Sequence, residues 1–246
     1  MLYGVISDIH GNLEAAIAVN DFLHKNRIEK LLVLGDVVGY GVNPEECIEL
    51  FESFQTVFIK GNHEEAVITG NYDMFTTDAR ISIEWTEGHL SRFARETISG
   101  WKTTVELEDF VICHGGLVAP LYFYTNSRSK AKRIFDEFEF KICFIGHTHF
   151  PMAFSISDGQ KLPAIIAQRP DGRMRIFLEG DKRYIINTGS VGQPRDGNPN
   201  ACCAIFDTES RIFELHRISY PVEITAKKIL DAGLPSSLAA RISRGL

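Results

Sequence analysis

The sequence predicts an α/β protein with two β-sheets, flanking helices and a small helical insertion. Strand-like and helix-like segments alternate over residues 2–60, and strand-like segments dominate the second half of the chain. We find no repeat, low-complexity tract or linker that would divide the 246 residues. The chain is long enough to bury one large core, so we predict a single domain over residues 1–246.

The first part of the chain predicts three parallel strands joined by helices. Buried strands are expected at residues 2–7, 30–34 and 56–60. Asn12 can cap a first helix, whose apolar residues recur at helical spacing, and Pro44 can begin a second helix over residues 45–54. An order of strand, helix, strand, helix, strand implies a right-handed parallel arrangement.

The middle of the chain, residues 64–101, predicts a helical insertion over one edge of the core. The residues that we expect on its inner face are Ile81, Trp85, His89, Leu90 and Phe93. Later strands are predicted at residues 110–113, 142–145, 153–156, 164–167, 174–178, 184–187, 202–206 and 213–218, with a helix near residues 129–137. Two helices, 222–232 and 236–244, close the chain over residues 222–244.

Composition and charge exclude several classes of protein. The net charge of −6 gives no basis for general binding to nucleic acid or to an anionic membrane, and the longest apolar runs are too short to span a membrane. The chain begins with a strand-like run in place of a secretion signal. Five cysteines without a CxxC pair fit a reduced, cytoplasmic protein. Cys202 and Cys203 are expected on opposite faces of a strand, and a vicinal redox pair is the alternative.

Five short polar motifs occur along the chain, and each follows a predicted strand. They are Asp8-Ile9-His10, Gly35-Asp36, Gly61-Asn62-His63, His114-Gly115 and Gly146-His147-Thr148-His149. Ligands of open α/β sheets gather at the carboxyl ends of the strands, so we expect the motifs to converge. Each motif alone is more often a turn or a surface polar group, but chance does not account for all five in strand-ending positions.

The motifs supply oxygen and imidazole nitrogen ligands and no thiolate. Such ligands suit Mn²⁺, Fe²⁺, Co²⁺, Ni²⁺ or Zn²⁺ better than Ca²⁺. In extended chain, residues i and i+2 point the same way, which lets Asp8 and His10 share one ion and lets His147 and His149 reach a common site. Asp36 stands in the middle of the series and is the natural bridging carboxylate. The sequence therefore predicts two neighbouring divalent metal ions.

This ordered set resembles the signature of the calcineurin-like metallophosphoesterase superfamily, and the residues around it resemble its small prokaryotic phosphodiesterase and phosphatase branch. The resemblance covers about residues 2–206 and implies a four-layer αββα sandwich of two mixed sheets. It implies that one metal is held by Asp8, His10 and His149 and that the second is held by Asn62, His114 and His147. Asp36 would be shared, and His63 would contact the phosphate and protonate the leaving oxygen.

The leading hypothesis is a metal-dependent phosphoesterase. A hydroxide that bridges the two metals would attack a phosphodiester or a phosphomonoester in line, and His63 would assist the leaving group. A Ser/Thr protein phosphatase or a dinucleoside polyphosphate hydrolase is the alternative in the same class, although Gly39-Tyr40-Gly41 stands where those enzymes carry Asp-Arg-Gly. A non-catalytic protein-binding scaffold and a structural metal site are the alternatives from other classes.

Three further residues are candidates for supporting roles. Arg195, in a loop rich in Gly, Pro and Asn, could hold a phosphate oxygen, and Asn12 could face the substrate as well as cap its helix. Glu64 could orient His63 or lie on the surface as a solvated carboxylate. The expected partner is a small phosphorylated substrate, which could be a nucleotide. We expect neither membrane binding nor general binding of nucleic acid. The closing helices offer a surface for a homo-oligomer.

Overall fold

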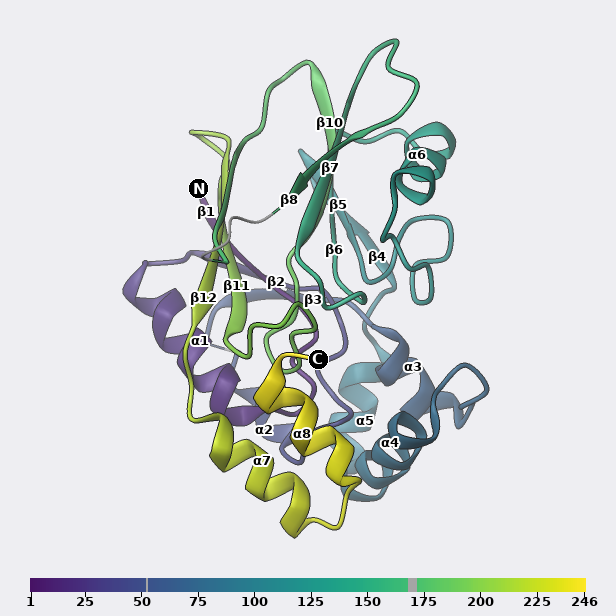
Figure 1. The fold of residues 1–246 in the computed structure, drawn as a ribbon, viewed down its shortest axis with the longest axis vertical. Coiled ribbons are helices and arrows are strands. Elements are labelled where there is room, and N and C mark those ends of the chain that lie inside the picture. Colours follow the sequence, from purple (N-terminus) through teal and green to yellow (C-terminus); the bar gives the residue numbers. More distant parts are fainter. Residues whose placement is uncertain (52, 168–171) are drawn as a thin grey trace.

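The computed structural model describes residues 1–51, 53–167 and 172–246, which form two mixed β-sheets with helices on their outer faces (Figure 1). The first sheet has the order β3 (Gln55–Phe58), β2 (Lys30–Val33), β1 (Leu2–Ile6), β11 (Ala201–Asp207), β12 (Ile212–Ile218) and β9 (Met174–Phe177). The second sheet has the order β4 (Thr104–Glu106), β5 (Phe110–Cys113), β6 (Ile142–Ile145), β10 (Lys182–Asn187), β7 (Met152–Ser157) and β8 (Ala164–Ala167).

Apolar clusters lie between successive layers of the molecule. The cluster between the two sheets contains Val5 and Leu32 from the first sheet and Phe144 and Ile186 from the second. Another cluster packs the first sheet against α1 (Leu13–Lys25) and α2 (Pro44–Glu49), and a third packs the second sheet against α6 (Arg128–Glu137). The predicted four-layer αββα sandwich is therefore confirmed.

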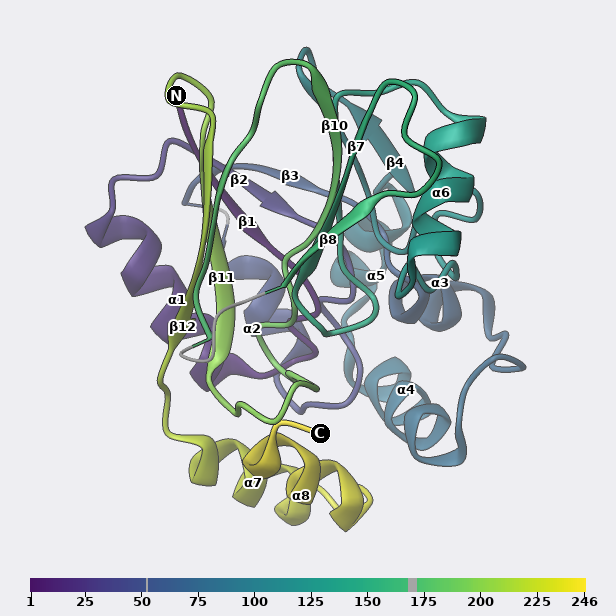
Figure 2. The ribbon, with the colours of Figure 1, turned by 45° about the horizontal axis from the view of Figure 1, so that its top comes forward.

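Each sheet contains three neighbouring parallel strands. In the first sheet β1, β2 and β3 are parallel, which confirms the arrangement predicted for the start of the chain. In the second sheet β5, β6 and β10 are parallel, and the other strand pairs are antiparallel. The loops after β1 and β6 meet, because the backbone N–H of His147 donates to the Asp8 carboxylate at 3.1 Å. The carboxyl ends of both parallel sets therefore share one edge of the sandwich (Figure 2).

Local sequence explains where the first two helices begin, whereas packing decides where the second one ends. The Asn12 side chain accepts a hydrogen bond from the backbone N–H of Ala15, as expected of a helix cap. Helix α2 begins at Pro44 but ends at Glu49, whereas the sequence predicted a helix to residue 54. The chain turns there, because Phe51 packs into the apolar cluster and its carbonyl accepts a hydrogen bond from the Thr56 hydroxyl at 2.6 Å. Position 52 lies outside the described residues.

The insertion consists of α3 (Asn62–Thr69), α4 (Thr77–His89) and α5 (Arg92–Ser99). Its inner face differs from the predicted one. Ile81 is 40% exposed, Phe93 is 74% exposed and His89 is exposed, whereas the inward residues of α4 include Ile83. Leu90 is buried and Trp85 is half-buried, as predicted.

Two hydroxyl groups explain the rotation of α4. Ser82 and Thr86 are both buried on its inner face. The Ser82 hydroxyl donates to the carbonyl of Ala79, and the Thr86 hydroxyl donates to the carbonyl of Ser82. A hydroxyl satisfied within its own helix can be buried at little cost, so the apolar pattern alone points to the wrong face.

The closing helices α7 (Val222–Asp231) and α8 (Ser236–Arg244) form a hairpin that lies beside α1 and α4 (Figure 1). An apolar cluster joins Leu238 and Ile242 of α8 to Tyr40 and to Ala79 of α4. On the other side of the hairpin, the Thr225 hydroxyl of α7 donates to the Asn12 side chain at 2.9 Å. The hairpin therefore bridges the loops after β1 and β2 and the insertion.

The five cysteines are all buried free thiols. Cys202 contributes to the cluster between the sheets, and Cys203 contributes to the cluster beneath α1, so they lie on opposite faces of β11 as predicted. Within the described ranges, no helix has the length and apolar character that crossing a membrane requires.

Candidate metal centre

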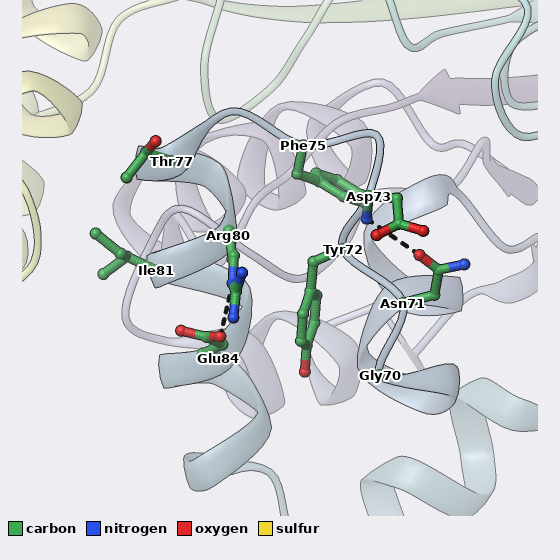
Figure 3. A pocket seen from close by; sticks show the side chains of 9 residues that line it. All are labelled: Gly70, Asn71, Tyr72, Asp73, Phe75, Thr77, Arg80, Ile81 and Glu84. Atoms are coloured by element: carbon green, nitrogen blue, oxygen red, sulfur yellow. Dashed lines mark hydrogen bonds and ion pairs between the residues drawn. The ribbon is translucent and has the colours of Figure 1, made fainter.

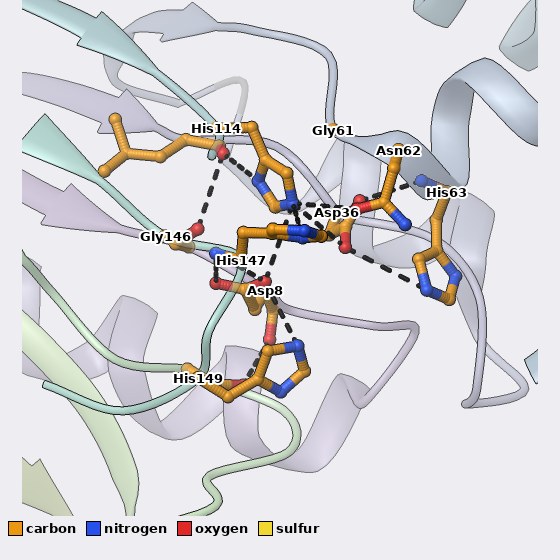
Figure 4. A network of polar contacts seen from close by, with 12 residues as sticks. Asp8, Asp36, Gly61, Asn62, His63, His114, Gly146, His147 and His149 are labelled. Carbon is orange, nitrogen blue, oxygen red and sulfur yellow. Dashed lines mark hydrogen bonds and ion pairs between the residues drawn. The ribbon is translucent and has the colours of Figure 1, made fainter. Parts of the chain in front are cut away.

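The seven predicted ligands lie together at the shared edge of the two sheets, and Figure 4 labels all of them except His10. Asp8 and His10 follow β1, and Asp36 follows β2. The others are Asn62 at the start of α3, His114 after β5, and His147 and His149 after β6. The predicted convergence at the carboxyl ends of the strands therefore occurs.

The backbone at this edge is not extended. Five of the seven residues have left-handed conformations, with φ angles of +55° for Asp8, +52° for His10, +52° for Asp36, +66° for His147 and +58° for His149. The extended-chain reason for pairing residues i and i+2 is therefore wrong, although Asp8 and His10 do meet. His147 and His149 point to different groups of ligands. Aspartate and histidine tolerate this conformation better than bulkier side chains do, and such strain is typical of functional sites.

One group of donor atoms consists of Asp8, His10, Asp36 and His149. The Nε2 atom of His149 lies 3.2 Å from the Asp8 carboxylate and 3.1 Å from Nε2 of His10. The same His10 nitrogen lies 3.7 Å from the Asp36 carboxylate. Two imidazole nitrogens and two carboxylates thus face one point, and all four residues are buried.

A second group consists of Asp36, His114 and His147, with Asn62 beside them. The Nε2 atom of His114 lies 3.2 Å from the Asp36 carboxylate, 3.1 Å from Nδ1 of His147 and 3.1 Å from the Asn62 amide oxygen. Asp36 belongs to both groups. The arrangement corresponds to two adjacent sites that share one carboxylate.

Backbone carbonyls fix the histidine tautomers. The Nδ1 atom of His10 donates to the carbonyl of Val38 at 3.0 Å, and Nδ1 of His114 donates to the carbonyl of Leu34 at 2.7 Å. His149 does the same with the carbonyl of Gln193 at 2.6 Å. Because a carbonyl only accepts, each of these Nδ1 atoms carries a proton, and each Nε2 is left to face the cluster. Metal-binding histidines usually donate their other ring N–H in this way, which orients the ring.

Electrostatics also fit a cation. Burial lowers the pKa of His10 and of His149 well below the usual value, and it lowers the pKa of His147 to about 3. Burial also lowers the pKa of His114, but the Asp36 charge outweighs this effect and raises it to about 10. Neutral buried imidazoles beside two carboxylates suit a borderline divalent ion, and a proton on His114 would compete with it.

His63 lies at the edge of this cluster, with its Nε2 atom 4.0 Å from the Asp36 carboxylate. Its ring packs against Tyr40 and edge-on against Phe75, at centroid distances of 4.7 and 5.1 Å. The other ring nitrogen, Nδ1, is buried and has no hydrogen-bond partner among the residues that the structure describes. Burial lowers the pKa of His63 to about 4, so in the metal-free protein the ring is neutral at pH 7 and keeps one N–H to donate.

Gly39 explains why His63 lacks a partner at Nδ1. A Cβ atom at Gly39 would lie 2.1 Å from that nitrogen, and the glycine has a φ of +83°. The ring thus occupies the space that a side chain at position 39 would need. Glycine at position 39, where Asp-Arg-Gly would place an aspartate, therefore leaves room for the ring, which is held by packing against Tyr40 and Phe75.

Glu64 has neither of the roles that the sequence suggested. It is fully buried, and its carboxylate accepts hydrogen bonds from the backbone N–H groups of Asp36, Val37, Val38 and Gly61 at 2.7–3.1 Å. The side chain therefore ties α3 to the loop that carries Asp36. Burial and the Asp36 charge raise the pKa of Glu64 to about 7.

Two residues after β10 support the cluster, and sequence reasoning missed both. The Asn187 amide donates to the Thr148 hydroxyl at 3.0 Å, and the Ser190 hydroxyl donates to the carbonyl of Asp8 at 2.7 Å. The motif Asn187-Thr188-Gly189-Ser190 follows a predicted strand at the same edge, which is the signal that could have identified them.

The two predicted substrate contacts have different positions. Asn12 is buried, and its amide donates to the carbonyl of Gly192 and to the Tyr220 hydroxyl, so it is not brought into the cavity beside the cluster. Arg195 does line that cavity. Its guanidinium donates to the Gln193 side chain at 2.9 Å and to the Tyr124 hydroxyl at 3.5 Å.

The cavity has a volume of about 210 Å³ and opens above the ligand cluster. It is lined by four of the proposed ligands, Asp36, Asn62, His147 and His149, and by His63. The lining also includes Phe75, Tyr122, Tyr124, Arg195 and Arg241, and the two tyrosines are each 39% exposed. A small anion could therefore reach the cluster while remaining in contact with aromatic rings and guanidinium groups.

A larger depression of about 870 Å³ also includes Phe75 in its lining (Figure 3). It is lined by residues of the α3–α4 connection and of α4, and it contains none of the seven ligands. Its guanidinium, Arg80, is paired with Glu84 at 2.8 Å. Phe75 is the residue that lines both hollows among those that the structure describes.

Several known proteins are similar to this chain. The model of the calcineurin-like phosphoesterase superfamily domain matches residues 1–211. An uncharacterized protein of Methanocaldococcus jannaschii is 33% identical over 256 residues, which cover 99% of this chain and 98% of that protein. The crystal structure of a metallophosphoesterase from Sphaerobacter thermophilus superposes with a TM-score of 0.85 at 32% identity, with 100% of both chains covered.

A structural relative with lower identity shares the fold. The hypothetical protein of known crystal structure from Pyrococcus horikoshii has a TM-score of 0.80 at 17% identity, and the match covers 100% of this chain and 98% of that one. This likeness concerns the fold alone. It extends to the whole chain, including the closing helices beyond residue 211.

Proposed function

The chain belongs to the calcineurin-like phosphoesterase superfamily, and on that premise we propose that it is a two-metal hydrolase of a phosphodiester or a phosphomonoester. The observation that carries the proposal is the position of Asp36, whose carboxylate belongs to both groups of donor atoms. A single structural metal would not require a second group of ligands beside the first. The open cavity above the cluster also favours catalysis over a closed structural site.

Two divalent ions are proposed, one for each group of ligands. Asp8, His10 and His149 would hold the first ion, Asn62, His114 and His147 would hold the second, and Asp36 would be shared. When bound, such ions supply Lewis-acid activation of water and neutralise charge on the phosphate. Mn²⁺, Fe²⁺, Co²⁺, Ni²⁺ and Zn²⁺ all suit this set of oxygen and imidazole ligands.

His63 and Arg195 would act directly on the substrate. The Nε2 atom of His63 faces the cluster, and its N–H can donate to the oxygen of the leaving group. An anionic phosphate beside the ring would raise the pKa of His63 from its low value, whereas the bound cations would act in the opposite direction. Arg195 lines the same cavity and can donate to a phosphate oxygen once it leaves Gln193 or Tyr124.

The protein phosphatase alternative has less support. The arginine of an Asp-Arg-Gly motif is absent, and the space for the preceding carboxylate is filled by the His63 ring. The non-catalytic scaffold also has little support, because this chain retains every proposed ligand and a histidine beside them. We also propose a cytoplasmic location, because the buried thiols fit a reducing compartment.

Hydrolysis by the reconstituted protein tests the proposal. Metal-free protein is titrated with Mn²⁺ and assayed on bis(4-nitrophenyl) phosphate and 4-nitrophenyl phosphate. Turnover is expected to require two equivalents of metal. H63A should lower kcat by about a hundredfold or more and keep its metal, whereas the exposed control H89A should match the wild type. Metal binding without turnover on either ester would contradict the proposed hydrolase.

A further inference from the structure

The closing hairpin contributes a charged side chain to the active-site cavity. Arg241 lies in α8, beyond residue 211, where the match to the family domain ends. Its side chain nevertheless lines the same cavity as Asp36, His63 and Arg195. A segment outside the catalytic sandwich thus contributes an arginine to the cavity that four of the proposed metal ligands also line.

The position of Arg241 is fixed from two sides. Leu238 and Ile242, which flank it on the helix, are buried against Tyr40 and Ala79. At the end of α8, the carbonyl of Gly245 accepts a hydrogen bond from the backbone N–H of Gly197 at 2.8 Å. That bond joins the helix to the loop that carries Arg195. The two guanidinium groups are therefore mounted on elements that are tied together.

The two arginines differ in how their charge is satisfied. Arg195 donates to Gln193 and lies near the Tyr124 hydroxyl. The guanidinium of Arg241 has no hydrogen bond or ion pair with any residue in the described ranges, and the side chain is half-buried. Asp36 is the one carboxylate among the described residues that line the cavity, and its charge faces the metal ligands. An unpaired guanidinium over a small cavity is a suitable partner for an anion.

The size of the cavity limits the ligand. About 210 Å³ is less than the volume of most sites that enclose a whole drug-sized ligand. The space accommodates a reacting phosphate and a nearby group, while the rest of a larger molecule would lie against Tyr122 and Tyr124 at the partly exposed rim. A second group of the same ligand, close to the reacting phosphate, would then contact Arg241 in the cavity lining.

We propose that Arg241 binds a second anionic group of the substrate, so that the preferred substrate is a phosphate ester with another phosphate or carboxylate close to the reacting phosphate. This inference rests on the proposed function, because it takes the first phosphate to lie on the metal cluster. Planar guanidinium binds either anion through paired N–H donors. The charge of Arg241 then distinguishes such substrates from simple monoesters.

Calorimetry on the manganese-loaded full chain tests this inference. The probes are propylphosphonate, alkane bisphosphonates with spacers of two to four carbons, and 4-phosphonobutanoate, none of which is hydrolysed. The best bisphosphonate should bind the wild type about tenfold more tightly than propylphosphonate, as expected for one partly exposed charge-assisted contact. A similar gain with 4-phosphonobutanoate would identify a carboxylate as an acceptable second group.

The variant R241Q should reduce the ratio of the two dissociation constants about tenfold, and R241K should restore part of it. The control is R244Q, which removes the same charge from an exposed position of the same helix and should keep the wild-type ratio. Three results would each overturn the inference. The wild type could show no preference for a second anion, R241Q could lose affinity equally for all probes, or R244Q could show the same change as R241Q. Turnover of the 4-nitrophenyl esters in the same samples separates its failure from failure of the proposed hydrolase.

Discussion

Gly39 offers a sharp test of how His63 is held. Replacing Gly39 with alanine would place a Cβ atom 2.1 Å from Nδ1 of His63, which no side chain can tolerate without a shift. The backbone neighbours of Gly39 are fixed, because the N–H of Val38 is bound to the buried carboxylate of Glu64. The imidazole ring is therefore the group that must move, and its Nε2 atom would leave its place beside Asp36.

The expected effect has two separable parts. A left-handed backbone costs an alanine about 1–2 kcal/mol relative to glycine, which should appear as lower stability. The displacement of the ring should appear in catalysis, because losing a positioned general acid lowers the rate by about a hundredfold or more. The G39A protein should thus approach the turnover of H63A while keeping its metal content.

Gly159 provides the matched control. Its φ of +79° is close to the +83° of Gly39, but a Cβ atom there would meet nothing within 4 Å. G159A should lose the same stability in urea unfolding and retain the wild-type kcat on bis(4-nitrophenyl) phosphate with Mn²⁺. In an H63A background, G39A should cause no further loss of turnover. Wild-type turnover in G39A, or an equal loss in G159A, would refute the packing argument.

Other substitutions test the remaining parts of the structure. E64Q should weaken Mn²⁺ binding by about 10–100-fold in calorimetry, because two buried backbone N–H groups lose their acceptor. The control E65Q should leave Mn²⁺ binding unchanged, because Glu65 is partly exposed and pairs with Lys60. D36N should lower the metal content from two ions to one or none by elemental analysis, and full occupancy in D36N would refute the sharing of Asp36. I83A should lower the free energy of unfolding in urea by about 2–5 kcal/mol, because Ile83 is fully buried. I81A should lower it by less than about 0.5 kcal/mol, because Ile81 is 40% exposed. A larger loss in I81A than in I83A would contradict the observed inner face of α4.

The sequence alone determined the convergence of the ligands and the order of the elements, except for β4 (Thr104–Glu106), which it did not predict. Apolar runs of four to seven residues can be recognised as buried strands because burial on both faces removes the polar alternation. Polar motifs at the ends of parallel strands must then meet at one edge, which brought Asp8, Asp36, His114 and His147 together as predicted. The left-handed backbone that aims these side chains was not visible in the residue types.

Tertiary structure decided the features that depend on surfaces from distant segments. The inner face of α4 was set by two hydroxyls that satisfy themselves within the helix, so an apolar count favoured Ile81 over Ser82. The role of Glu64 was set by four backbone N–H groups, three of which lie on another loop. The position of Arg241 was set by the packing of α8 against Tyr40 and Ala79. Local sequence encodes the conformation of a segment, but the burial and partners of a side chain depend on which other segment packs over it.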